Sequence, residues 1–321
     1  MDKAKGYICI AFSTVLFSTL EITLKSTAAL FNPVQLTMIR FLIAGAALVP
    51  MAAARLRRGG GSLDAKAIGK LAALGFVGLF IGMNIYQMSL AYTKASVVSV
   101  LFSTNTLFVT LFALPVLGEK IEKKSIIAIA FQIIGVIMII QPWNTRLSAV
   151  GVTLALLSAA AFAIYGVLGK GESTRYGGVV TTCVCSLAAG AEILIYSAIS
   201  HIPAVSSFMN GIGMTAFADV PLFSGITSRN IFVLLYAGAV VTGGGYMTYF
   251  MAMEHLKAQT VSLVFFFKPM LAPVLAMIIL NEVIPFSMVI GIVIMLLGSS
   301  VALFGDRLFR RGFETAQRLH L

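Results

Sequence analysis

The chain has 321 residues, of which 59% are hydrophobic and 11% are charged, and its formal net charge is +11. Because a soluble domain carries roughly 25% charged residues, this composition excludes a soluble globular protein and indicates a chain whose main solvent is lipid. The basic residues stand in short clusters between long apolar runs, which is typical of membrane topology signals and argues against a nucleic-acid surface.

Ten apolar segments follow one another, and each is predicted to cross the membrane as a helix of about 20 residues. In chain order they are residues 6–29, 34–54, 70–91, 96–117, 125–140, 149–168, 179–200, 230–253, 260–280 and 285–304. The first is predicted to be a span and not a cleaved signal, because it holds Glu21 and Lys25 and lacks a small-residue cleavage site. The one long connection, 201–229, is interpreted either as a plain connector or as a lid.

Basic residues are divided unequally between the two ends of these spans. If the N-terminus lies inside, the outer segments hold only Lys94, Arg146 and Arg229, and the other loop cations lie on the inner side. The positive-inside rule therefore predicts that both termini are cytoplasmic. We expect an integral protein of a bacterial inner (plasma) membrane, as a monomer or a homodimer.

The sequence repeats itself. Residues 163 positions apart coincide without a gap across spans three to five and eight to ten: Gly75/Gly238, Tyr86/Tyr249, Ser99/Ser262, Phe102/Phe265, Glu119/Glu282 and Gly135/Gly298. Residues 145 positions apart align span one with span six: Phe17/Phe162 and Lys25/Lys170. Five spans per half is an odd number, so the halves are predicted to cross the membrane in opposite directions. Secondary transporters with such inverted repeats bind substrate near the midplane, between the halves.

The predicted fold is an all-α integral membrane protein with ten transmembrane helices in two inverted five-helix repeats. Residues 1–145 form the first repeat, 146–305 the second, and 306–321 a basic cytoplasmic tail. The cysteines Cys9, Cys183 and Cys185 lie in apolar runs and are interpreted as packing residues. The histidines are scattered, so neither a metal site nor a cofactor is predicted.

Polar side chains inside a span need a partner or a cavity, because a charge at the bilayer centre costs roughly 2.5–3.5 kcal/mol. The first span has a polar face made by Thr14, Ser18, Glu21 and Lys25. Here Glu21 either pairs with Lys25 or lines a cavity. The fourth span has a face made by Ser96, Ser99, Ser103, Thr106 and Thr110, which serves either helix packing or a pore, and Asn105 stands beside it.

The ninth span contains the stretch FFFKPMLAP, in which Lys268 interrupts an apolar run. Lys268 and Asn105 are equivalent in the repeat, so each half is predicted to place a polar group near the midplane. Pro269 and Pro273 each remove a backbone donor, and we expect a kinked helix at this point. Lys268 is interpreted either as a substrate ligand or as an ion-pair partner of Glu21 or Glu192.

Four further side chains complete the candidate site. Arg40 in the second span either extends to the outer interface or helps bind an anion. The equivalent tyrosines Tyr86 and Tyr249 either pack or form a cavity wall. Glu192, like Glu21, is a candidate for proton coupling, because burial makes a charged carboxylate less favourable.

These segments together resemble the drug/metabolite transporter superfamily, specifically its EamA-type members. The resemblance rests on FSTLEITLK (Phe17–Lys25), QLTMIRFLIAGAALVP (Gln35–Pro50), LPVLGEK (Leu114–Lys120) and KPMLAPVLAMIILNE (Lys268–Glu282). It implies a ten-helix secondary carrier with a central cavity, often an exporter of amino acids, other metabolites or drugs. Family members often have glutamate at the position of Lys268, and Trp-Gly-Ser at the positions of Phe17, Ser18 and Thr19.

We therefore expect an exporter of small metabolites such as amino acids, with Lys268 facing a carboxylate and a glutamate facing an ammonium group. Two alternatives stay open. One is an uptake or exchange carrier for a phosphorylated or dicarboxylate compound, held by Lys268 and Arg40. The other is an integral membrane enzyme, which is disfavoured because no nucleophile motif is found. The expected partners are the lipid bilayer and a small-molecule substrate, with no nucleic acid.

Overall fold

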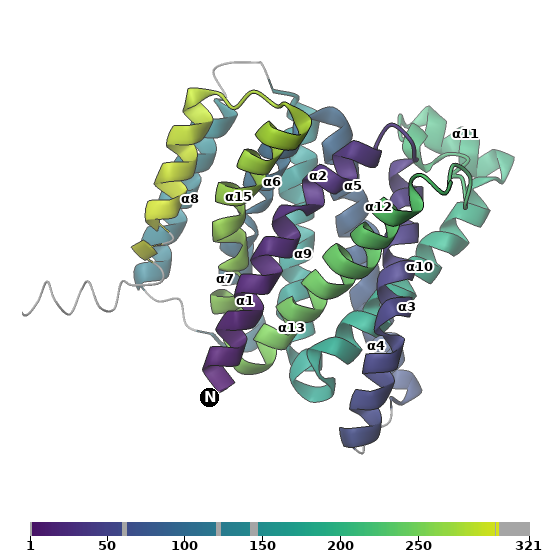
Figure 1. Cartoon of the computed structure of the whole chain (residues 1–321), viewed down its shortest axis with the longest axis horizontal. Coiled ribbons are helices and arrows are strands. Elements are labelled where there is room, and N and C mark those ends of the chain that lie inside the picture. The colour runs from purple at the N-terminus through teal and green to yellow at the C-terminus, as the bar shows by residue number, and fades with distance from the viewer. Residues whose placement is uncertain (1, 60–62, 120–122, 142–146, 299, 302–321) are drawn as a thin grey trace, which may run out of the picture.

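The structure, a computed structural model, describes residues 2–59, 63–119, 123–141, 147–298 and 300–301. Within these ranges the elements are helices, and they stand side by side as a bundle (Figure 1). In chain order they are α1 (Asp2–Ser18), α2 (Leu20–Thr27), α3 (Pro33–Gly59), α4 (Ala65–Gly75), η1 (Phe76–Gly82), α5 (Met83–Tyr92), α6 (Ala95–Phe102), α7 (Asn105–Leu117), α8 (Lys123–Ile140), α9 (Ala149–Tyr176), α10 (Gly178–Ser200), α11 (Pro203–Gly211), η2 (Thr215–Phe217), α12 (Ile231–Leu235), η3 (Tyr236–Gly244), α13 (Gly245–His255), α14 (Ala258–Val261), α15 (Val264–Leu280) and Phe286–Gly298.

Eight helical segments of the described chain are long and apolar enough to cross a membrane. They are Lys3–Thr27, Pro33–Arg58, Ala65–Tyr92, Ala95–Leu117, Ala149–Tyr176, Gly178–Ser200, Ile231–His255 and Ala258–Leu280. The fifth and tenth predicted spans are the shorter apolar helices Ser125–Ile140 and Phe286–Gly298. The all-helical membrane fold is thus confirmed, whereas the number of ten full spans stays a prediction.

The two halves of the chain interdigitate. Helix α1 of the first half packs on α13 and α15 of the second, α3 packs on α10 and η3, and α9 packs on α5 and α7. Figure 1 shows the purple α1 lying against the green α13 and α15. Glycine permits one of these contacts: a Cβ on Gly245 would lie 2.6 Å from Cε1 of Phe17. A cavity in the middle of the bundle is therefore lined by both halves.

Several spans are interrupted inside the bundle, and two interruptions are related by the repeat. The third and eighth spans each contain a π-helical stretch, η1 and η3, and both stretches are rich in glycine. The first span breaks at Thr19, between α1 and α2. The fourth breaks at Ser103 and Thr104, between α6 and α7. Breaks of this kind free backbone groups and redirect side chains toward the interior.

The ninth span is interrupted ahead of its prolines, and the expected kink at Pro269 stays a prediction. The assigned helix α15 runs without interruption through Pro269 and Pro273. The break lies earlier, at Ser262 and Leu263, where the backbone N–H of Phe265 bonds Ser262 O at 2.9 Å. The fourth span has three-residue hydrogen bonds of the same kind at its own break, where Ser103 N–H bonds Val100 O at 3.1 Å.

The long connection 201–229 is anchored to the helices beneath it. Asn32 donates to Ala216 O at 2.9 Å, Gln35 donates to Ser224 O at 2.7 Å, and the Tyr196 hydroxyl donates to Phe217 O at 2.9 Å. Its helix α11 lies at the opposite edge of the bundle from α8 (Figure 1). This anchoring favours a connector over a lid.

Candidate functional site

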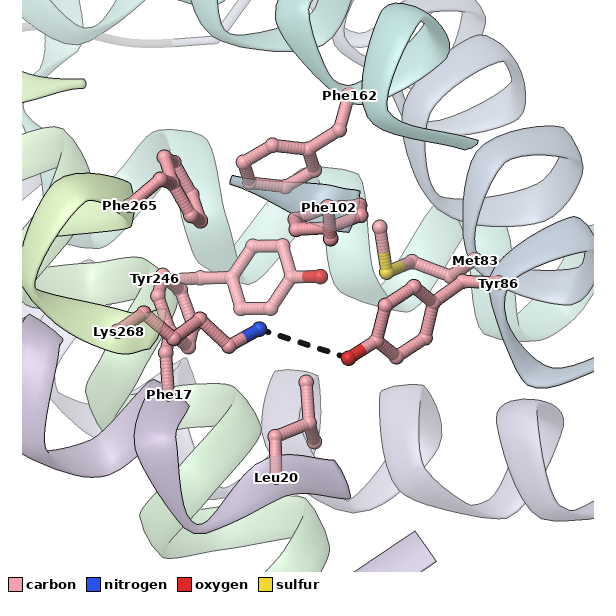
Figure 2. Close-up of a pocket in the computed structure, with 9 residues that line it drawn as sticks. All are labelled: Phe17, Leu20, Met83, Tyr86, Phe102, Phe162, Tyr246, Phe265 and Lys268. Carbon is pink, nitrogen blue, oxygen red and sulfur yellow. Dashed lines mark hydrogen bonds between the residues drawn. The ribbon is translucent and has the colours of Figure 1, made fainter. Parts of the chain in front are cut away.

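Three polar side chains meet between the two halves. The ammonium group of Lys268, on α15, forms an ion pair with Oε1 of Glu21, on α2. The hydroxyl of Tyr86, on α5, donates to the same oxygen and lies 3.5 Å from the lysine nitrogen (Figure 2). The side chains of Lys268 and Glu21 are each 1% exposed. Of the two partners expected for Lys268, the structure brings Glu21 to it and not Glu192.

Helix breaks position this ion pair. Because α2 begins again after Thr19, Glu21 falls in its first turn, where the helix dipole favours a negative charge. The restart of α15 at Val264 places Lys268 one turn into the helix. The lysine nitrogen then lies 4.9 Å from the ring centre of Phe102 and 5.5 Å from that of Tyr86. Aromatic faces attract a cation at these distances, so they help to compensate for lost hydration.

Of the two roles expected for Glu21, the structure does not show the pairing with Lys25. The ammonium group of Lys25 donates instead to the carbonyl oxygens of Leu90 and Thr93, the latter at 3.1 Å. These carbonyls lie at the end of α5, where a helix leaves acceptors unpaired. Lys25 is therefore a helix-capping residue, and Glu21 is free to pair across the halves.

A small pocket lies against Lys268. Its lining is mostly aromatic, and Figure 2 shows the Tyr246 hydroxyl directed into the space between Lys268 and Tyr86. The lining residues are Phe17, Leu20, Met83, Tyr86, Phe102, Phe162, Tyr246, Phe265 and Lys268. Each of these residues is at most 4% exposed, and the space between them has room for roughly one water molecule. The conformation is therefore closed around the charged group, and a metabolite would enter only after an opening movement.

Arg40 is a second buried cation close to this site. Its side chain is 1% exposed, so it does not extend to a membrane interface. The guanidinium lies 5.1 Å from the ring centre of Phe41, and none of its three nitrogens has a hydrogen-bond partner in the described structure. Its charge interacts with those of Glu21 and Lys268. Arg40 thus feels the charge of Glu21 without contacting it, and a buried charge without full compensation is costly.

Besides Glu21 and Arg40, four predicted residues lie outside the pocket lining. Asn105 donates to Ala159 O at 2.9 Å, and Ser103 donates to Val100 O at 2.5 Å. Tyr249 packs on Phe162 and Phe265, and its hydroxyl has no partner. Glu192 is partly exposed on α10, away from the ion pair. The repeat equivalence of Asn105 and Lys268 therefore does not place both side chains in the pocket of this conformation.

The repeat carried a signal for pocket residues that the sequence reasoning did not use. Three equivalent pairs all line the pocket: Phe17/Phe162, Met83/Tyr246 and Phe102/Phe265. The ion pair has no such counterpart, because the equivalents of Glu21 and Lys268 are Gly166 and Asn105. The hydroxyl of Tyr249, the equivalent of Tyr86, points at Gly166, where a Cβ would be 2.7 Å away. The pocket is thus symmetric in its walls and asymmetric in its charges.

Comparison with known proteins gives a consistent family assignment. The family model described as the EamA-like transporter family matches residues 4–141 and 149–304. A Clostridium kluyveri protein described as an uncharacterized transporter is 35% identical over 305 residues, 92% of each chain. An Archaeoglobus fulgidus protein with the same description is 22% identical over 92% of this chain and 97% of its own. A protein of known crystal structure superposes with a TM-score of 0.69 at 18% identity, over 94% of this chain and 97% of that one, which supports the fold alone.

Proposed function

We propose a function from one premise: this chain belongs to the EamA-like transporter family, within the drug/metabolite transporter superfamily. It is an integral membrane transporter. The proposal is that it carries a small metabolite with a carboxylate group, such as an amino acid, out of the cell by alternating access. Both termini would lie in the cytoplasm and the protein in a bacterial inner membrane, since the basic loops favour that orientation.

One observation carries the substrate class: two buried cations, Lys268 and Arg40, are opposed by the single carboxylate of Glu21 at an aromatic pocket. A substrate carboxylate would compensate the second cation. If it replaced Glu21 at Lys268, Glu21 would become free to accept an ammonium group or a proton. Phe102, Phe162 and Phe265 offer an apolar wall to the remainder of the molecule. Asn105, Ser103 and Tyr249 would contact substrate only in an open conformation.

Thermal stabilisation of purified protein tests the substrate class. We expect zwitterionic amino acids and simple monocarboxylates to raise the melting temperature, because a ligand that binds the native state stabilises it by mass action. Amines that match them in size but lack a carboxylate should have no effect. Lys268→Ala should abolish the stabilisation. Equal stabilisation by the amines, or a full response from Lys268→Ala, would refute the carboxylate site.

The alternative is an exchanger or uptake carrier for a phosphorylated or dicarboxylate compound. The unpartnered guanidinium of Arg40 favours it, because a doubly charged anion could engage both cations. Counterflow in proteoliposomes separates the two functions. A dianion carrier requires both Lys268 and Arg40, whereas a monocarboxylate carrier should retain part of its transport in Arg40→Ala. Accumulation into vesicles without substrate on the far side would argue against obligatory exchange.

Proton coupling would involve Glu21, because its carboxylate is the one that substrate would release from Lys268. The prediction is a substrate-driven proton flux that Glu21→Gln removes. Glu192→Gln is the matched control, since its carboxylate lies outside the pocket. Transport with an unchanged pH gradient dependence in Glu21→Gln would exclude this role.

A further inference from the structure

Two glutamates outside the pocket make the same unusual contact. Glu119 follows the end of α7, and its carboxylate accepts from the backbone N–H groups of Ala258 at 3.1 Å and Gln259 at 3.5 Å. Glu282 follows the end of α15, and its carboxylate accepts from the backbone N–H groups of Ala95 at 2.8 Å and Ser96 at 3.0 Å. Each glutamate thus caps the first turn of a helix in the other half of the chain.

The two contacts are equivalent in the internal repeat. Glu119 and Glu282 are 163 positions apart, and so are Ala95 and Ala258. Glu119 follows the end of the fourth span and accepts from the start of the ninth span. Glu282 follows the end of the ninth span and accepts from the start of the fourth. A carboxylate at a helix start is stabilised by charge-assisted hydrogen bonds and by the helix dipole. The contacts therefore tie the two halves together through matched, directional bonds.

The contacts lie at opposite ends of the bundle. At the first, Lys170 bonds both Glu119 and the carbonyl of Leu256, and Leu256 packs against Gly6 near the start of α1. The second lies at the start of α6, directly after Thr93, whose carbonyl accepts from Lys25 near the end of α2. The span formed by α1 and α2 therefore runs from one contact to the other, and the Glu21 pair lies along its length.

We propose that Glu119 and Glu282 are the two gate latches of the transporter, a role that rests on the alternating-access part of the proposed function. A latch here means one of these glutamates with the two backbone N–H groups it accepts from. Opening toward one side breaks the latch on that side, while the other stays closed. Both latches are closed in this structure, in agreement with a pocket that admits roughly one water molecule.

The two latches have the same backbone hydrogen bonds, but their additional interactions differ in strength. Glu119 also forms an ion pair with Lys170 at 2.9 Å, with the two side chains only 9% and 20% exposed. Glu282 accepts instead from the Ser96 hydroxyl at 2.6 Å, and Lys25, the repeat equivalent of Lys170, bonds elsewhere. Hydrogen bonds to charged groups contribute more than neutral ones, and a partly buried ion pair adds to them. Opening at the Glu282 end should therefore be the easier of the two.

Site-directed labelling from the two membrane faces tests the latches without any substrate. Native cysteines are replaced, Leu20→Cys in the pocket lining serves as reporter, and an impermeant maleimide is applied to right-side-out and inside-out vesicles. We expect Glu282→Ala to raise the ratio of labelling from the Glu282 side to that from the Glu119 side roughly tenfold, because a charged hydrogen-bonded contact is lost. Glu119→Ala should lower the ratio to a similar extent, and the double variant should return it toward the starting value.

Glu254→Ala is the matched control. Glu254 lies at the same end as Glu119 and also caps a helix, accepting from the backbone N–H of Gly178 at 2.6 Å within the second half. Its ion pair across the halves, with Arg55 at 3.6 Å, involves an arginine side chain that is 59% exposed, and such a pair contributes little. Glu254→Ala should therefore leave the ratio unchanged. If an alanine variant is lost on purification, the glutamine variant should move the ratio in the same direction by at least threefold.

The outcomes separate the latches from the rest of the function. Shifts in the same direction for Glu119→Ala and Glu282→Ala, or shifts no larger than that of Glu254→Ala, would overturn the latches. Labelling from one face alone in every variant would overturn alternating access and the latches with it. Opposite shifts in a protein that fails to bind carboxylates would support the latches and reject only the substrate class.

Discussion

Removing the buried ion pair one partner at a time is the sharpest perturbation of the pocket. Glu21→Gln leaves Lys268 and Arg40 as two buried cations without an anion. Lys268→Met leaves one carboxylate and one guanidinium, whose charges still attract each other. Breaking a buried pair typically costs about 3–5 kcal/mol, because an uncompensated charge remains. Both single variants should therefore be strongly destabilised, and Glu21→Gln should be the worse of the two.

The double variant Glu21→Gln with Lys268→Met should be more stable than Glu21→Gln alone, because one of the two unopposed cations is gone. Its coupling energy should be of the order of 2 kcal/mol or more, since contacting residues in one network are not additive. The assay is the fraction of folded protein after heating, read by size-exclusion chromatography of a fluorescent fusion. Additive single variants, or a Lys268→Met protein less stable than Glu21→Gln, would refute the placement of two cations around one carboxylate.

Two further predictions concern packing and the tyrosine hydroxyl. Gly245→Ala should destabilise the protein by about 1–3 kcal/mol, because its Cβ would meet Phe17 at 2.6 Å. Gly69→Ala is the control: a Cβ there has no atom within 4 Å, so this variant should be neutral or slightly stabilised in the same melting assay. Tyr86→Phe should cost about 1–3 kcal/mol, because Glu21 loses a buried hydrogen-bond donor, and a melting temperature equal to that of the parent would contradict the bond.

Hydropathy and the internal repeat predicted most of the fold, because both are patterns that can be measured in the amino-acid sequence alone. The helical class and the eight long spans follow from apolar length alone. The packing of the helices of one half between those of the other was not predicted. The two shorter helices satisfied the composition criterion but not the length criterion. The broken helices were harder to locate, since the breaks at Thr19, Ser103 and Ser262 have no proline beside them that would mark the position.

The sequence predicted which kinds of charged groups the site contains better than it predicted which of them pair in space. The cost of a buried charge required a partner for Lys268, and Glu21 was one of two candidates. Sequence spacing also left Lys25 open as a partner for Glu21, because residues four apart share a helix face. In the structure Lys25 donates instead to the carbonyl groups at the end of α5, which no local pattern reveals. Tertiary context therefore decided the pairing.

The pocket walls are symmetric in the repeat, whereas the charges are not. This difference matters for a pocket that must open first to one side of the membrane and then to the other. Alternating access in an inverted repeat requires that each half be able to take the other's role, and the equivalent pairs Phe17/Phe162 and Phe102/Phe265 meet that requirement for the apolar wall. A substrate carboxylate needs a defined partner in both states, and a symmetric pair of lysines would leave excess charge when empty. One lysine paired with Glu21, with the neutral Asn105 at the repeat-equivalent position, leaves only the charge of Arg40 without a paired carboxylate in the described structure. In the proposed function, the charged side chains would stay beside the substrate while the latches at the two ends of the bundle open and close in turn.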